Sequence, residues 1–173
     1  MDRTLLAAEI DRTCRLHGSF TLRSGQVATE YFDKYRFEAQ PTLLRAVAQE
    51  MVPLLPPETE LLGGLELGGV PLATMVSSLT GLPTLFVRKQ AKEYGTRRLA
   101  EGADPRGRHV TLIEDVVTTG GAVRAAALAL RALDARVDVV VCAIDRSGAV
   151  DGPLSDVGLQ TRAVFTKADL DRA

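Results

Sequence analysis

The chain has no tryptophan, two cysteines, two histidines and no long hydrophobic run. A membrane-spanning helix needs about 20 consecutive apolar residues, so we expect no membrane partner. Cys14 and Cys142 lie in a helix-like and a strand-like segment, and we interpret both as small buried apolar residues with nothing to support a disulfide. His17 and His109 have no partner at metal-ligand spacing, which indicates structural roles for both.

Charge of one sign is not in excess either. The 21 basic and 22 acidic residues give a formal net charge of −1, so nucleic acid is not an expected partner. Asp2, Glu9 and Asp11 interrupt the pattern of a signal peptide, and we expect a cytoplasmic protein. With 173 residues, 46% of them hydrophobic, the chain has the size of a single domain (1–173) with a full core.

The segment 110–122 is the most informative part of the sequence. It begins with a short, β-branched apolar run that predicts a buried strand. Glu114 and Asp115 follow at the carboxyl end of this strand, which is where open α/β sheets bind ligands. The turn 118–121 has the sequence Thr-Thr-Gly-Gly, and the residues after it favour a helix.

This order of strand, acidic pair, turn and helix points to a particular ligand. The turn directs backbone N–H groups and hydroxyls to one point at the positive end of a helix, and that arrangement favours phosphate. The carboxylates repel phosphate and are better suited to hydroxyl groups or a metal ion. A ribose 5-phosphate matches both halves. The alternative is an ordinary strand–turn–helix unit with a solvated acidic pair.

Strands and helices alternate through residues 41–145, which predicts an α/β fold with a central, mainly parallel sheet flanked by helices. Residues 1–40 are expected to form a small N-terminal hood over the carboxyl edge of the sheet. Residues 89–108 have no clean period and are expected to form a long flexible loop. Helices are expected at 5–16, 41–55, 71–80 and 122–133, and strands at 61–65, 84–88, 110–115, 137–144 and 163–165.

The acidic pair and its Thr/Gly turn resemble the phosphoribosyl-pyrophosphate (PRPP) motif of the type I phosphoribosyltransferases. The resemblance implies their fold and Mg²⁺ as cofactor, held mainly by substrate oxygens and water. It also implies that Glu114 and Asp115 hold the ribose hydroxyls and stabilise positive charge that grows on the sugar ring.

The long loop carries three cations within five residues, Arg88, Lys89 and Lys92. A solvated charged loop is the generic interpretation. The order is also similar to the Arg-Lys-x-x-Lys-x-His-Gly catalytic loop of the orotate phosphoribosyltransferases, with Tyr94 at the usual histidine. This resemblance implies that Lys92 reaches the leaving group, and that the protein is a homodimer in which the loop serves the neighbour's site.

Three further segments resemble the same family. Arg23 and the aromatic pair Tyr31 and Phe32 match its first motif, although aromatic packing of the hood is an equal interpretation. The segment 64–73 resembles the pyrophosphate loop, with Gly68 where many relatives have lysine. Arg146 matches an arginine that pairs with the carboxylate of orotate, and a simple surface Asp–Arg pair is the alternative.

The resemblance therefore implies an orotate phosphoribosyltransferase with Glu114, Asp115 and Lys92 as catalytic residues. A transferase for another base and a non-catalytic PRPP-sensing regulator remain as alternatives. The implied PRPP-binding residues are Arg23, Arg88, Lys89, Lys92, Tyr94, Glu114, Asp115, Val116, Val117, Thr118, Thr119, Gly120, Gly121 and Ala122. The implied orotate-binding residues are Tyr31, Phe32, Thr118 and Arg146.

Overall fold

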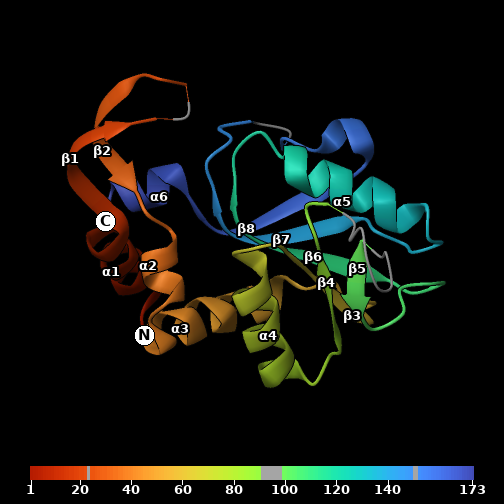
Figure 1. Ribbon diagram of the computed structural model, residues 1–173. Helices are drawn as coiled ribbons and strands as arrows, with labels where there is room; N and C mark the ends of the chain where they lie inside the picture. Colours follow the sequence, from red (N-terminus) through yellow and green to blue (C-terminus); the bar gives the residue numbers. More distant parts are fainter. Residues whose placement is uncertain (23, 91–98, 150–151) are drawn as a thin grey trace.

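A six-stranded sheet forms the centre of the molecule, and helices cover both of its faces (Figure 1). The computed structural model describes residues 1–22, 24–90, 99–149 and 152–173. The strand order is β5-β4-β3-β6-β7-β8; β5 pairs antiparallel with β4, and the other neighbours are parallel. The predicted α/β fold with a mainly parallel sheet is confirmed.

The bounds of the elements are as follows. The sheet contains β3 (Leu61–Leu65), β4 (Thr84–Val87), β5 (Ala100–Gly102), β6 (Val110–Val117), β7 (Val139–Asp145) and β8 (Gln160–Thr166). A separate hairpin contains β1 (Arg15–Thr21) and β2 (Val27–Phe32). The α-helices are α1 (Arg3–Cys14), α2 (Tyr35–Glu38), α3 (Pro41–Met51), α4 (Gly69–Thr80), α5 (Gly121–Arg131) and α6 (Lys167–Asp171), and two 3₁₀ turns are η1 (Val52–Leu54) and η2 (Ser155–Val157).

The hydrophobic core lies in two layers, one on each face of the sheet. Strand β7 shows the separation well, because successive side chains of a strand point to opposite faces. Val139, Val141 and Ala143 pack with residues of α1, α3 and α4, whereas Val140 and Cys142 pack with residues of α5. Both faces are thus covered, which explains why the strands are apolar without alternation.

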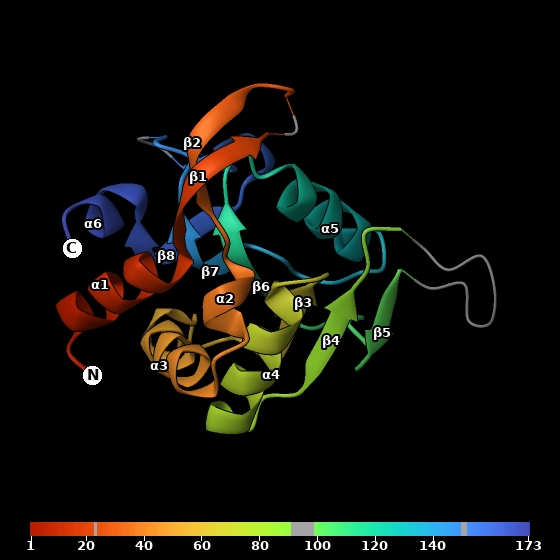
Figure 2. The same ribbon diagram turned by 60° about the vertical axis from the view of Figure 1, so that its left-hand side comes forward.

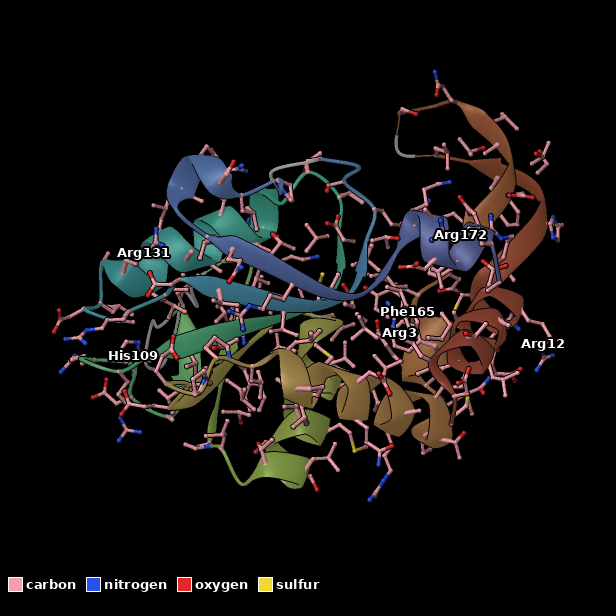
Figure 3. The ribbon with its side chains drawn as sticks, turned by 180° about the vertical axis from the view of Figure 1, so that it is seen from behind. Arg3, Arg12, His109, Arg131, Phe165 and Arg172 are labelled. Atoms are coloured by element: carbon pink, nitrogen blue, oxygen red, sulfur yellow. The ribbon has the colours of Figure 1, made fainter. Side chains whose placement is uncertain are left out.

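The hood stands at one end of the sheet, and its hairpin projects beyond the carboxyl ends of the strands (Figure 2). Helix α1 lies beside α6, and the Arg3 guanidinium carbon is 5.1 Å from the ring centroid of Phe165, at the end of β8 (Figure 3). His109 lies at the opposite end of the molecule from the hood, with Nε2 3.2 Å from Arg136 Nη1 (Figure 3). The N-terminal helix α1 therefore packs the hood against the C-terminal segment that contains β8 and α6.

Several predicted boundaries are wrong. The long loop expected at 89–108 is interrupted by β5, an edge strand too short to show a period in the sequence. The helix expected at 5–16 ends at Cys14, and the chain continues directly into β1. The helix expected at 41–55 ends at Met51 and passes into η1, which contains Pro53.

Within the described residues, no helix is long and apolar enough to cross a membrane. Cys14 and Cys142 are both buried and both free, so the two thiols do not form a disulfide with each other.

Candidate active site

The turn between β6 and α5 presents the start of a helix at the carboxyl edge of the sheet. Gly120 is the N-cap of α5 with φ 73°, a left-handed conformation that favours glycine. A Cβ on Gly120 would lie 2.6 Å from Leu154 Cδ2, so the turn is also tightly packed. Among the described residues no side chain caps α5, and its first turn carries no acidic residue, which leaves the first amides available for an anion.

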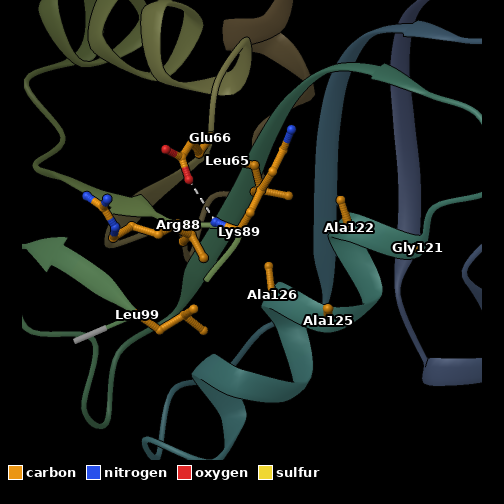
Figure 4. Close-up of a pocket in the computed structure, with 10 residues that line it drawn as sticks. Leu65, Glu66, Arg88, Lys89, Leu99, Gly121, Ala122, Ala125 and Ala126 are labelled. Carbon is orange, nitrogen blue, oxygen red and sulfur yellow. Dashed lines mark hydrogen bonds between the residues drawn. The ribbon is translucent and has the colours of Figure 1, made fainter. Parts of the chain in front are cut away.

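A cavity of about 340 Å³ lies beside this turn (Figure 4). Gly121 and Ala122 line it on one side, and Arg88 and Lys89 line it on the other. Arg88 Nε is buried and has no hydrogen-bond partner among the described residues, and the Arg88 side chain extends away from the α5 side of the cavity (Figure 4). The backbone N–H of Lys89 donates to Glu66 Oε2 at 2.9 Å, which connects the loop after β3 to the loop after β4.

The acidic pair is buried rather than solvated. Asp115 is 0% exposed and Glu114 is 8% exposed. Glu114 Oε1 accepts from the Asp115 N–H at 3.0 Å, and Asp115 Oδ1 accepts from the Val116 N–H at 2.5 Å. Asp115 Oδ2 lies 2.6 Å from Lys34 Nζ, which comes from the hood just before α2. The simple interpretation of a solvated acidic pair is therefore wrong.

A third carboxyl group, Glu38 of α2, belongs to the same cluster and is 8% exposed. Burial and the proximity of Asp115 raise the pKa of Glu38, and the same two causes raise the pKa of Glu114. Burial alone would raise the pKa of Asp115 as well, but its contacts with Glu114 and Lys34 lower it overall. The negative charge of the cluster is thus concentrated on Asp115, next to the ammonium of Lys34.

Gly68 borders this cluster, and its lack of a side chain has a structural reason. A Cβ there would lie 1.7 Å from Asp115 Oδ2 and 2.8 Å from Glu38 Oε1. No side chain fits at residue 68 unless the carboxylates move. The cation that lies close to Asp115 comes from Lys34 instead.

Phe32 and Arg146 meet between the hood and the end of β7. The guanidinium carbon of Arg146 is 5.5 Å from the ring centroid of Phe32, within the range of a cation–π contact. The Arg146 N–H donates to Val117 O at 2.8 Å, which fixes the arginine beside the turn after β6. The ring of Tyr31 instead lies 5.6 Å from that of Phe20 within the hairpin, and Tyr31 is 46% exposed.

The structure brings most of the predicted residues to one edge of the sheet, although not into one cavity. Glu114, Asp115 and Arg146 do not line the cavity of Figure 4. Val116 and Val117 are the last residues of β6, and only residues from 118 onward form the turn. Arg23, Lys92 and Tyr94 lie outside the described residues.

Sequence reasoning missed Lys34, Glu38 and Glu66. Asp33-Lys34 directly follows the aromatic pair, which is the one signal that pointed to residue 34. Within the described residues, no group of three or more His, Cys, Asp or Glu side chains is arranged to hold a metal ion. A divalent cation at this edge would therefore need oxygen ligands from a substrate or water.

The chain was compared with a family model and with known proteins, and these matches point to one family. Residues 56–160 match the family model of the phosphoribosyl transferase domain. An orotate phosphoribosyltransferase of Nocardioides sp. is 72% identical over 173 residues, which cover 100% of this chain and 96% of that protein. One of Methanocella arvoryzae is 39% identical over 88% of this chain and 87% of that protein.

Solved structures agree with the sequence relatives. Orotate phosphoribosyltransferase of Mycobacterium tuberculosis, in complex with Fe(III) dicitrate, superimposes with a TM-score of 0.87 at 33% identity, covering 98% of this chain and 99% of that one. The same enzyme in complex with PRPP gives a TM-score of 0.84 at 28% identity, with 99% of both chains covered. The chain therefore belongs to the orotate phosphoribosyltransferase family.

Proposed function

We propose that the protein transfers the 5-phosphoribosyl group of PRPP to orotate, giving orotidine 5′-monophosphate and pyrophosphate in the synthesis of UMP. The observation that carries this proposal is the meeting of three features at one edge of the sheet: the uncapped turn before α5, the buried carboxylates at the end of β6, and Arg146 on the ring of Phe32. These features suit a phosphate, a ribose and an acidic base in that order.

In this mechanism the turn at residues 118–122 holds the 5-phosphate with backbone amides and threonine hydroxyls. Glu114 and Asp115 hold the ribose hydroxyls, and the ionised Asp115 stabilises positive charge that grows on the ring as the bond to pyrophosphate breaks. Arg88, Lys89 and Lys92 neutralise the pyrophosphate, with Arg23 and Tyr94 as further contacts. The position of Arg88 and Lys89 along the cavity, opposite Gly121 and Ala122, supports that assignment. Positioning and electrostatics then supply the rate.

Orotate is held by Arg146 through its carboxylate, since a guanidinium presents two parallel donors to the two oxygens. The ring of Phe32 packs on the pyrimidine, and Thr118 and Tyr31 complete the base site. The contact between Arg146 and Phe32 supports a pocket that binds a flat ring and a negative charge together.

Mg²⁺ is the cofactor that we propose, and the oxygens of the substrate and of water are the hard ligands that it prefers. When bound with PRPP, it supplies positive charge to the leaving pyrophosphate. The protein contributes the surrounding cations and carboxylates, and it holds the metal mainly through substrate oxygens and water.

We further propose that the protein works in the cytoplasm as a homodimer with shared active sites, without nucleic acid or membrane partners. The two free, buried cysteines support a reducing compartment. The resemblance of the loop 88–95 to the catalytic loop of the family supports a loop that serves the neighbour's site.

A panel of bases tests the function directly. Purified protein would be mixed with PRPP, Mg²⁺ and orotate, and the loss of orotate absorbance followed, with adenine, hypoxanthine and uracil in parallel. We expect turnover with orotate alone. Turnover of another base would contradict the proposed substrate, and PRPP binding without any turnover would support a regulator.

A further inference from the structure

Within the described part of the chain, Lys34 is the cation that pairs with the acidic residues of β6. Its Nζ lies 2.6 Å from Asp115 Oδ2, and its side chain is 32% exposed whereas that of Asp115 is 0% exposed. The ammonium therefore lies between the buried carboxylate and the open side of the site. No other ion pair involving Asp115 or Glu114 occurs among the described residues.

A buried carboxylate needs such a partner, because an ionised carboxylate without one is strongly destabilised in a protein interior. Three carboxyl groups, Glu38, Glu114 and Asp115, lie together here, and the charge of Lys34 acts on all three. Like charges at this range cannot all be present together, so one ammonium selects which group keeps its charge.

The surrounding backbone fixes the pair from the opposite side. A Cβ at Gly68 would lie 1.7 Å from Asp115 Oδ2, so the carboxylate already fills the space beside residue 68. Asp115 Oδ1 accepts from the Val116 N–H at 2.5 Å, which fixes its other oxygen. Lys34 is the cation that contacts the carboxylate among the described residues, beside the carboxyl groups of Glu38 and Glu114, and it comes from the hood rather than from the sheet.

We propose that Lys34 is a positioning residue for the transfer reaction: it keeps the Asp115 carboxylate charged and oriented toward the sugar that the site binds. This inference rests on the proposed function, and it adds a residue of the hood to the machinery of the sheet. Any movement of α2 relative to β6 would change the charge on Asp115, so the hood and the catalytic carboxylate are linked.

Kinetics of Lys34→Met test the proposal, and Lys34→Arg restores the charge. Arg36→Met, two residues further along in α2, is the matched loss of an exposed charge. We expect Lys34→Met to lower kcat by about 10- to 100-fold, the usual effect of losing a group that orients a reacting one, with smaller changes in KM. Lys34→Arg should recover most of kcat, and Arg36→Met should match the wild type.

The pH profile separates this role from simple destabilisation. Without the ammonium the pKa of Asp115 rises, so the acidic limb of kcat/KM should move to higher pH in Lys34→Met and return in Lys34→Arg. The profile must also take into account the other titratable groups that face Lys34 and the carboxylates, namely Cys14, Asp33, Tyr35, Glu38, Glu114 and Cys142. A folded Lys34→Met with kcat within about twofold of the wild type and an unmoved acidic limb would overturn the proposal.

A second measurement uses the wild-type protein, so it depends neither on the folding of Lys34→Met nor on turnover. The carboxyl carbons of ¹³C-labelled aspartate can be titrated by NMR in the wild type. Asp115 should stay ionised at a pH where a free aspartic acid side chain takes up a proton. If Asp115 titrates with free aspartic acid or above it, the role of Lys34 is wrong even when orotate is converted. If orotate is not converted, the proposed function fails separately.

Discussion

Single residues at this site matter through the charges that they hold or neutralise. Arg146 illustrates this, because its guanidinium already rests on the ring of Phe32 and its N–H is fixed on Val117 O. An acidic base that enters here exchanges water for a preorganised donor pair. The choice of base should therefore depend on the shape of the guanidinium as well as on its charge.

Arg146→Lys is expected to lower kcat/KM for orotate by roughly 10- to 100-fold, which corresponds to about one charge-assisted hydrogen bond. The affinity for PRPP, measured by calorimetry, should be unchanged, and Arg36→Lys serves as the exposed control. Equal losses for orotate and for PRPP would show that Arg146 supports the fold rather than selecting the base.

Glu38 gives a prediction for stability against pH. Burial and Asp115 raise its pKa from 4.5 to about 8, so the folded protein holds a proton that the unfolded chain has released between these values. The free energy of unfolding must therefore fall as pH rises through this window. In Glu38→Gln this loss is absent.

The melting temperature of Glu38→Gln relative to the wild type should increase from pH 5 to pH 8 and then stay constant. Glu58→Gln, which removes an exposed carboxylate, serves as the control substitution. A constant difference between Glu38→Gln and the wild type across the whole range would contradict a raised pKa for Glu38.

Elements position these residues, and the start of α5 is the most demanding of them. Gly120 needs both a positive φ and a missing side chain, whereas Gly158 needs only the positive φ, 65°, because nothing lies within 4 Å of the place that a Cβ would take. Substitutions at the two glycines therefore separate the effect of backbone strain alone from the effect of disturbing the packed turn before α5.

Gly120→Ala and Gly158→Ala should both lose about 1 kcal/mol or more of stability, because alanine is strained at a positive φ. Only Gly120→Ala should also lose affinity for PRPP, measured by calorimetry, since its methyl group displaces Leu154 and with it the turn. Similar PRPP affinity in the two variants would argue against phosphate binding at this turn.

The sequence predicted those elements that are long or carry a local signal. Strand β6 and the turn after it were recognisable because a β-branched run, two carboxylates and glycines are adjacent in the chain. Strand β5 and helices α2 and α6 were missed, since each is only three to five residues long and depends on tertiary contacts. The cluster of Lys34, Glu38 and Asp115 was missed for a related reason. About 80 residues separate Lys34 and Glu38 from Asp115, and no local pattern links the two segments.

The whole molecule combines a two-faced sheet with a hood that reaches over its carboxyl edge. The hood contributes Phe32 to the proposed base site and Lys34 to the carboxylate cluster, while Arg146 directly after β7 and Asp115 in β6 come from the other side. Both halves of the site thus depend on how the hood sits on the sheet, and α1 and α6 fix that arrangement.

Mixed dimers test the proposed sharing of sites between subunits. Lys92→Ala and Arg146→Ala should each be nearly inactive alone. After subunit exchange, a mixture should recover up to about a quarter of wild-type activity, because half of the two-fold dimers are mixed and each has one intact site. Verified exchange without recovery would show that each loop serves its own subunit.

The most direct test of the account is a crystal structure of the wild-type protein with orotidine 5′-monophosphate, which holds phosphate, ribose and base in one molecule. We predict that the phosphate lies on the amides of residues 119–122, the ribose hydroxyls face Glu114 and Asp115, and the orotate carboxylate meets Arg146 beside Phe32. A nucleotide whose phosphate lies away from that turn, or whose base does not reach Arg146, would contradict it.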